Sequence, residues 1–304
     1  MDEKRLSAVL SLVCMAMLAA RADGHAIVGD RLFPGTLTFD DPAVADELSG
    51  PVLARQKHPA FGGPDVEDIS VSGSFSRLII PGLSIGADTD WTEHDGPGGP
   101  SANGIGATHL TLKGQAYEDL EHETMIAASL SWGLGGIGNP DLHAHAYDTI
   151  EPGVAFGRGF GDLPDDLAFL RPFGVAGGMV VDLPLTGKSR PAPGAAVASN
   201  PVIIHWGFAL EYSARYGMSA GEEPVNQFVP LVEFQFDSPL NGGFGTKMAG
   251  TVNPGLAYAA ETWQLSAEAI VPLNHPGGSP GFRFGVSFFL DDLIPSLFGK
   301  PLLQ

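Results

Sequence analysis

The chain has 304 residues, of which 44% are hydrophobic, and its 35 acidic and 16 basic residues give a net charge of −19. Nucleic-acid binding needs a basic surface, so this charge excludes that class of partner. The 41 glycines and 25 prolines interrupt helices, and beyond the N-terminal region no run of eighteen apolar residues could form a transmembrane helix. Apolar content without helices indicates β-sheet.

Residues 1–26 are typical of a cleaved signal peptide. Two basic residues precede an apolar run at 6–20, which is shorter than a membrane-spanning helix requires. Gly24 and Ala26 have the small-residue spacing of a cleavage site, so we expect the mature chain to begin at residue 27. Cleavage after Ala22 and an uncleaved anchor are the alternatives. The only cysteine lies in this segment, so the mature chain has no internal disulfide.

Residues 27–66 show little strand pattern and are rich in Pro, Gly and Asp. We interpret them as an N-terminal extension, or as a plug folded into the lumen of a following barrel.

Residues 67–290 alternate with a period of two. The clearest run is 202–216, where Trp206, Phe208 and Leu210 share one apolar face while His205 and Glu211 share the other. Successive side chains of a strand point to opposite sides of a sheet, so each such run has an apolar and a polar face. Ten further runs behave similarly, and the candidate strands are 69–76, 83–91, 105–117, 123–133, 149–157, 169–183, 202–216, 228–237, 248–260, 263–271 and 282–290.

These strands predict an all-β fold, a single antiparallel transmembrane β-barrel in an outer membrane. Eleven candidates and the even strand number of bacterial barrels favour twelve strands, with ten as the alternative. A soluble two-sheet sandwich that binds a ligand is the competing fold, because alternation is common to both. Aromatic residues near the ends of the apolar faces, such as Trp91 and Tyr212, favour the barrel.

Four stretches resemble a family of uncharacterised proteobacterial outer-membrane barrels labelled as transporters of the phenol meta-pathway type. They are His25–Arg31 running into Thr38–Pro42, Gly157–Pro164, Thr251–Gly255, and Leu290–Leu293 ahead of Gly299–Pro301. The resemblance implies an outer-membrane barrel and brings no catalytic residues. A tail, 291–304, follows the last strand, where porins end in a terminal aromatic residue.

Polar residues of the non-apolar face are expected to line the lumen. An acidic lining favours cations or neutral polar solutes in a pore. The alternative is that these charges pair across a filled interior of a structural barrel that conducts nothing. The candidates are Lys113, His205, Glu211, Arg215, Glu233, Gln235, Asp237, Glu268 and Arg283.

No motif indicates catalysis, a cofactor or a metal. A Gly-x-Ser-x-Gly elbow is absent, and His143 with His145 lacks an identifiable third metal ligand. Asp162 to Asp166 is interpreted as the start of a short helix in a loop, with Asp162 as its cap. The expected protein is a non-enzymatic conduit for an unknown small solute, in contact with outer-membrane lipid.

Overall fold

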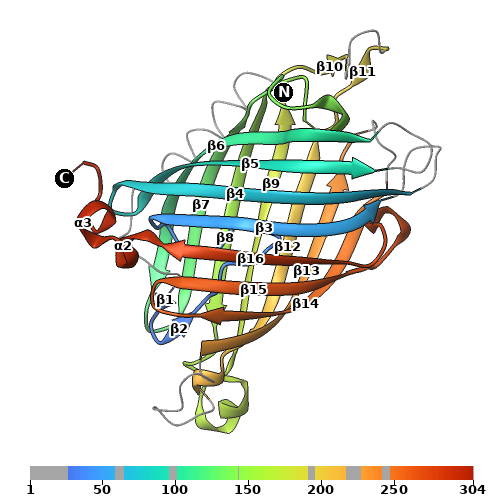
Figure 1. The fold of residues 1–304 in the computed structure, drawn as a ribbon. Helices are drawn as coiled ribbons and strands as arrows, with labels where there is room; N and C mark the ends of the chain where they lie inside the picture. Colours follow the sequence, from blue (N-terminus) through green and yellow to red (C-terminus); the bar gives the residue numbers. More distant parts are fainter. Residues whose placement is uncertain are drawn as a thin grey trace.

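The structure, a computed structural model, describes residues 27–58, 65–95, 101–142, 144–190, 196–216, 227–241 and 247–303. The predicted signal peptide and cleavage sites lie outside these residues, as does His143. Within them, twelve antiparallel strands close into one barrel, in which β12 begins the circle and β9 completes it (Figure 1). The strands are β3 (Glu47–His58), β4 (Val66–Ile80), β5 (Leu83–Asp95), β6 (Ala102–Asp119), β7 (Thr124–Gly133), β8 (Thr149–Gly159), β9 (Phe173–Pro184), β12 (Ile203–Tyr212), β13 (Phe228–Pro239), β14 (Ala249–Ala259), β15 (Trp263–Pro272) and β16 (Gly281–Phe289).

The remaining elements are short. They are the strand pairs β1 (Ile27–Val28) with β2 (Arg31–Leu32) and β10 (Lys188–Ser189) with β11 (Ala198–Ser199), the 3₁₀ turns η1 (Pro140–Leu142), η2 (Asp165–Leu170), η3 (Ala214–Tyr216) and η5 (His275–Gly277), and the helices α2 (Leu290–Leu293) and α3 (Pro295–Phe298). Across the described ranges, no helix combines the length and apolarity needed to cross a membrane.

The predicted all-β barrel of twelve strands is confirmed, but its first strand was missed. β3 lies in the stretch interpreted as an extension, so the barrel begins at Glu47 and not at residue 67. The register of β3 shifts between Ser49 and Val52, where a bulge interrupts the ladder to β4. Such a bulge moves the outward-facing positions from even to odd residues. The exposure of both Leu48, before the bulge, and Leu53, after it, shows this change. The alternation is therefore broken in the sequence although the strand continues.

Two local predictions also need correction. The strand predicted over 202–216 ends at Tyr212, and Arg215 lies in η3, where alternation no longer assigns a face. Asp162 does not cap a helix, because the 3₁₀ turn begins at Asp165 and has no side-chain cap. Its carboxylate instead accepts hydrogen bonds from Arg158.

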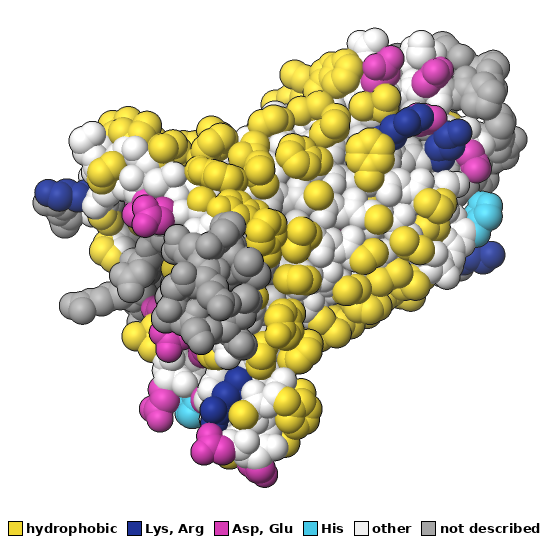
Figure 2. Space-filling model, turned by 60° about the horizontal axis from the view of Figure 1, so that its bottom comes forward, with side chains coloured by type: hydrophobic (Ala, Val, Ile, Leu, Met, Phe, Trp, Pro, Cys, Tyr) yellow, Lys and Arg dark blue, Asp and Glu magenta, His cyan; other side chains and the backbone are white. Residues whose placement is uncertain are grey.

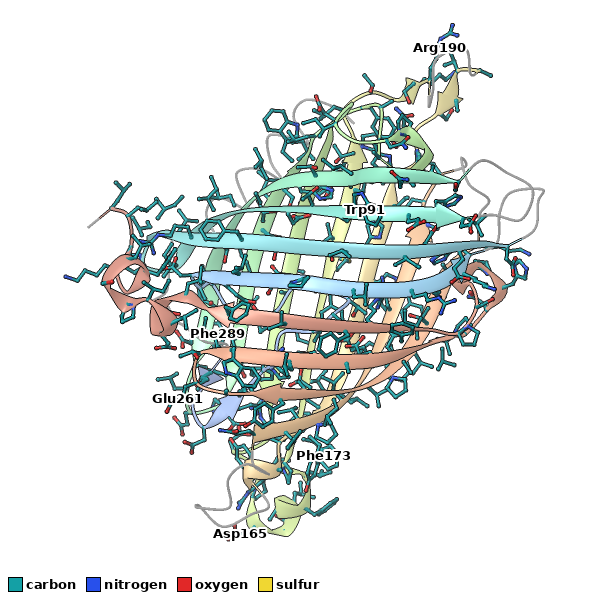
Figure 3. The ribbon with its side chains drawn as sticks, viewed as in Figure 1. Trp91, Asp165, Phe173, Arg190, Glu261 and Phe289 are labelled. Carbon is teal, nitrogen blue, oxygen red and sulfur yellow. The ribbon has the colours of Figure 1, made fainter. Side chains whose placement is uncertain are left out.

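The barrel has two unlike ends. At the turn end, where β3 begins and β16 ends, the connections 81–82, 120–123 and 260–262 are short, whereas 160–172 and 213–227 are longer. Every connection at the loop end, from 96–101 to 185–202, is longer than those three short turns. Figure 3 shows Glu261 and Phe289 towards the turn end and Arg190 at the opposite end.

The outer surface is an apolar belt between two aromatic bands. Apolar outward-facing side chains cover the flank of the barrel in Figure 2. Near the turn end, Phe173 contacts Tyr212, and Tyr258 lies between Phe228 and Trp263. Near the loop end, Trp206 stacks on Phe236. The belt includes Leu53, Val71, Ile85, Leu110, Phe156, Met179, Leu210, Leu256, Phe282 and Phe284, each more than a third exposed.

Candidate functional site: the lumen and its inner segment

Residues 27–46, called the inner segment below, run through the lumen. They contact inward-facing groups of β6, β12, β13 and β16, which lie on different sides of the closed barrel. A chain that touches opposite walls must cross the space between them. The contacts of the described residues therefore place this segment inside the barrel.

The inner segment is anchored at the turn end by a fully buried arginine. Arg31 Nε donates to Glu123 Oε2 at 3.0 Å, and both side chains are almost completely excluded from solvent. The guanidinium also donates to the carbonyls of Arg171 and Pro172, at 2.6 and 3.2 Å. A side chain at Gly159 would clash with Arg31 and Glu123, so only glycine leaves room for this pair.

The middle of the inner segment lies against the β12 to β16 wall. Thr38 Oγ1 donates to Glu233 Oε2, and Gln264 Nε2 donates to the carbonyl of Gly35 at 2.7 Å. Phe39 lies close to the backbone of Gly207. Because these contacts come from three different strands, they fix the path of the segment along this wall.

The opposite wall holds the inner segment through one lysine. Lys113 Nζ lies 2.7 Å from Asp40 Oδ2 and 3.4 Å from Asp41 Oδ1, and it donates to the Asp41 carbonyl at 2.7 Å. The segment ends at Asp46, whose carboxylate accepts from Arg77 and from the backbone N–H of Leu78. Buried charges thus hold the segment at both ends and in the middle.

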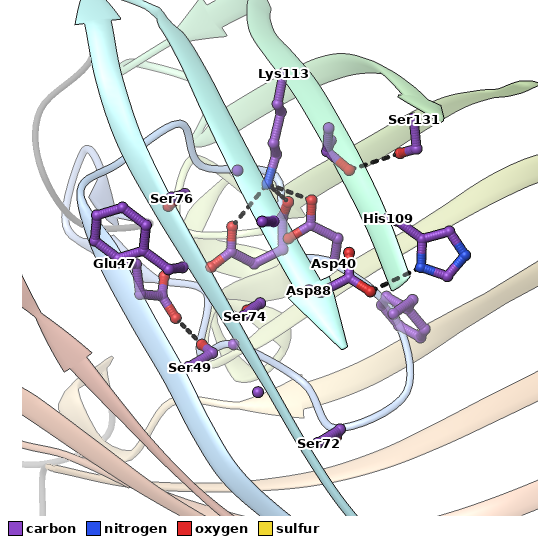
Figure 4. Close-up of a pocket in the computed structure, with 18 of the residues that line it drawn as sticks. Asp40, Glu47, Ser49, Ser72, Ser74, Ser76, Asp88, His109, Lys113 and Ser131 are labelled. Carbon is purple, nitrogen blue, oxygen red and sulfur yellow. Dashed lines mark hydrogen bonds and ion pairs between the residues drawn. The ribbon is translucent and has the colours of Figure 1, made fainter. Parts of the chain in front are cut away.

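A cavity of about 480 Å³ remains between the inner segment and the β3 to β7 wall (Figure 4). Hydroxyl groups line much of this wall, including Ser72, Ser74 and Ser131. Figure 4 shows Lys113 reaching the carboxylates of the inner segment, and His109 Nδ1 lies 2.8 Å from Asp88 Oδ2. Ser72, Ser74 and Ser76, which alternate along β4, therefore face water-accessible space.

A second cavity, of about 500 Å³, lies towards the loop end and shares His109, Lys113 and Phe39 with the first. Three contacts between a histidine and a carboxylate occur at this cavity, and each histidine belongs to its lining. His205 Nδ1 lies 2.7 Å from Asp237 Oδ1, His145 Nε2 lies 3.7 Å from Asp182 Oδ2, and His109 Nε2 lies 3.6 Å from Glu151 Oε1. Carboxylates and imidazoles thus meet at this level of the lumen.

The predicted lumen residues fall into two groups, with Arg215 apart. Lys113, His205 and Gln235 line the cavities, and Asp237 pairs with His205. Glu211, Glu233 and Glu268 are at most 5% exposed on the wall covered by the inner segment, and Arg283 Nη2 donates to Gln235 Oε1 at 3.3 Å. The side chain of Arg215 is outside the described residues.

The covered wall contains polar groups that the described residues leave unpaired. Both carboxylate oxygens of Glu211 and both side-chain polar atoms of Asn253 are buried without a hydrogen-bond partner there. Asn253 is opposite Glu233 in the β13–β14 ladder, so the two project from the same face. Unpaired polar groups are costly in a dry interior, so this wall suits contact with water better than permanent burial.

Sequence reasoning missed the polar residues of the inner segment and of the loop-end cavity. Asp40, Asp41 and Thr38 were not assigned because their segment has no strand alternation. Glu151 and Asp182 were missed because their strands, β8 and β9, are rich in glycine and apolar residues, which obscures the alternation of polar and apolar faces. No cluster of three or more His, Cys, Asp or Glu residues suited to a metal ion occurs among the described residues.

A closed barrel with an apolar belt, two aromatic bands and a polar interior defines the class of outer-membrane β-barrels. No family model matches the sequence, and no curated protein matches it. The crystal structure of the COG4313 outer membrane channel from Pseudomonas putida F1 is similar, with 11% identity and a TM-score of 0.59 over 85% of this chain and 98% of that chain.

Two porins are more distantly similar. The NanC porin has 11% identity and a TM-score of 0.48, over 80% of this chain and 99% of that one. The KdgM porin in complex with disordered oligogalacturonate has 10% identity and a TM-score of 0.45, over 78% of this chain and 98% of that one. At these identities the likeness concerns the fold alone, which is that of an outer-membrane β-barrel.

Proposed function

We propose that the protein is a gated conduit for small polar solutes in the outer membrane, with the inner segment as its gate. The observation that carries the proposal is the polar wall behind the segment, where Glu211, Asn253 and Glu233 are buried. A purely structural plug would be packed most stably against apolar side chains. A wall that becomes hydrated when the segment moves requires the polar groups found there.

The charges of the lumen favour cationic or neutral solutes. The cavity next to β3 to β7 has the carboxyl groups of Asp40, Asp41, Glu47, Asp88 and Asp90 in its lining, against the ammonium group of Lys113 and the imidazole of His109. Acidic linings favour cations in pores, and the many hydroxyl groups provide hydrogen bonds for neutral polar molecules. Cavities of about 480 and 500 Å³ are in the size range of small-molecule sites.

We also propose that the chain is related to the family labelled as transporters of the phenol meta-pathway type. Described residues of these four stretches take part in the contacts of the inner segment, the covered wall and the tail. Arg31 and Gly159 belong to the buried anchor, Asn253 belongs to the covered wall, and Leu290 donates its backbone N–H to the carbonyl of Asp46. That label implies a phenol-derived solute, which combines a hydroxyl group with a ring that could contact Phe39 in the lumen.

The test is ion conductance of the purified, folded protein in planar bilayers. We compare wild type, a variant lacking residues 29–44, and the same deletion combined with the Glu211→Gln, Glu233→Gln, Glu268→Gln triple substitution, because the deletion uncovers these three carboxylates. The deletion is expected to raise conductance, and the triple variant is expected to lower the preference for cations. Catechol and a polyol of similar size, added separately, test the solute class through their block of the current.

The alternative is a structural barrel that conducts nothing, and the proposal assigns no catalytic step. If the deletion variant migrates as a folded, heat-modifiable barrel and still conducts no current, the gated conduit is wrong and the structural barrel is favoured. If the deletion conducts but the triple variant keeps the cation preference, the gate stands and the assignment of the selective wall is wrong.

A further inference from the structure

The C-terminal tail, of which residues 291–303 are described, folds onto the outside of the barrel at the turn end. In Figure 1, α2 and α3 project there beside the ends of β3 and β4. β4 extends past the start of β3, because Glu47 pairs with Ser76 and the residues after Ser76 have no partner on β3. The tail occupies this free edge, where the backbone N–H groups of Leu302 and Leu303 donate to the carbonyls of Leu78 and Ile79, at 3.1 and 2.8 Å.

One arginine holds the tail in place. Arg77 donates to the carbonyls of Leu297, Phe298 and Lys300, at 3.0, 3.2 and 2.8 Å, and its guanidinium lies over the Phe298 ring at 5.0 Å. The same side chain pairs with the buried carboxylate of Asp46. These contacts fix the backbone of the tail, so the direction of its side chains is set by the fold.

The tail presents its apolar side chains outward. Leu297, Leu302 and Leu303 are 63%, 60% and 60% exposed, which is more than the leucines of the barrel belt. The tail is also continuous with that belt, because the Phe298 ring lies 6.3 Å from the ring of Phe75, an outward-facing residue of β4. The apolar surface of the barrel thus extends past the end of the strands onto the tail.

We propose that the tail is an interfacial anchor that lies in the phospholipid leaflet at the turn end of the barrel. A short amphipathic segment of this kind lies at the boundary of headgroups and acyl chains, with its apolar side chains a few ångströms deep. Leu302 and Leu303, next to Leu78 and Ile79 of β4, enter the acyl region. Lys300, which is exposed, remains at the level of the lipid phosphates and carries the opposite charge to them.

The proposal commits to lipid over a second copy of the chain because of position. The apolar tail surface adjoins the belt that a membrane barrel must present to lipid, and phospholipid at that level is present all around the barrel. The tail folds against its own barrel through Arg77 and the free edge of β4, so no partner chain is needed to complete it.

The test uses a fluorescent NBD group on a single cysteine. Cys14 is the only cysteine of the chain and lies in the predicted signal peptide, so the protein produced from residue 27 onwards permits labelling at chosen positions. The probe is placed by Leu302→Cys, with Leu256→Cys in the barrel belt as the lipid-facing control. Phe169→Cys in η2, also at the turn end, is the aqueous control because that side chain is 69% exposed on a connection away from the belt. Each protein is folded into phosphatidylcholine and phosphatidylglycerol vesicles that contain lipid with a doxyl quencher at carbon 5 or carbon 12.

Quenching at residue 302 is expected to reach at least half of that at residue 256, and to be stronger with carbon 5 than with carbon 12. Quenching no greater than at residue 169 would overturn the proposal. Energy transfer between copies labelled at residue 302, together with weak lipid quenching, would overturn it in favour of self-association. Heat-modifiability is required of each labelled protein, and Leu297→Cys provides a second position if Leu302→Cys does not fold. Failure of the conductance test for the gate would leave this result unaffected.

Discussion

The buried Arg31–Glu123 pair provides the sharpest test of the gate. Replacing Arg31 by alanine removes the 3.0 Å contact to Glu123 and two further hydrogen bonds, and it leaves a carboxylate buried without its cation. Breaking a buried ion pair in this way costs about 3–5 kcal/mol. The inserted position of the inner segment loses that stabilisation, while the released position, in which both groups meet water, does not.

This free energy corresponds to a change of about two to three and a half orders of magnitude in the equilibrium between inserted and released segment, since about 1.4 kcal/mol is tenfold. The measurement is the open probability of single channels in planar bilayers. Arg158→Ala is the matched control, because Arg158 pairs with Asp162 in a more solvent-accessible position at the same end. Such pairs contribute about 0–1 kcal/mol, so the control should change the open probability by less than about tenfold.

Equal open probability for Arg31→Ala and Arg158→Ala, in barrels shown to be folded by heat-modifiability, would refute the reasoning. It would mean either that the inner segment stays inserted without its anchor or that its release does not open the lumen. Protease accessibility of the inner segment separates these two cases, because only a released segment is cleaved.

The remaining predictions concern pH, the opposite wall and the belt. The pKa of Asp162 is lowered, chiefly by its hydrogen bond with Arg158, and the pKa of His122 is raised, chiefly by its hydrogen bond with Asp162. The lowered pKa of Asp162 stabilises the turn end above the ordinary Asp pKa of 3.8, and this stabilisation is lost as the pH falls through the lowered pKa. The raised pKa of His122 gives a stabilisation that is complete below the ordinary His pKa of 6.5 and is lost as the pH rises through the raised pKa. Resistance of the 160–172 connection to proteolysis should therefore be greatest between these two values, and a flat pH profile would contradict this assignment. Lys113→Met removes the cation that holds two carboxylates and should increase both conductance and cation preference, measured by reversal potential; unchanged values would show that this contact does not restrain the segment. Leu256→Arg places a charge on the lipid face and should lower folding stability in vesicles by about 2–4 kcal/mol in urea titrations, while Leu240→Arg, outside the strands, should have little effect.

Much of the fold is visible in the sequence because a membrane barrel imposes a simple rule on each strand. Lipid on one side and a polar lumen on the other force side chains to alternate, and eleven of the twelve strands show this pattern. The strand that was missed, β3, has a register shift near Ser49, and a shift of one residue is enough to hide alternation. Strand prediction therefore fails where the ladder is irregular.

The candidate site was predicted only in part for a related reason. Glu233 and Glu268 lie on strands whose alternation assigns them to the interior, so their inward position follows from the pattern. Asp40 and Thr38 lie on an irregular segment, and nothing local relates them to their partners on β6 and β13. Their importance depends on contacts between residues far apart in the chain.

The sequence by itself determined the class of fold, because alternation, charge and the absence of long apolar helices are local or compositional properties. Only the tertiary structure decided where the inner segment lies, which carboxylates it covers and how the tail returns to β4. Arg31 and Glu123 are 92 positions apart, and Arg77 contacts Leu297 across 220 positions. Barrel closure brings such residues together, and the pattern of any one strand contains no information about its neighbours across the lumen.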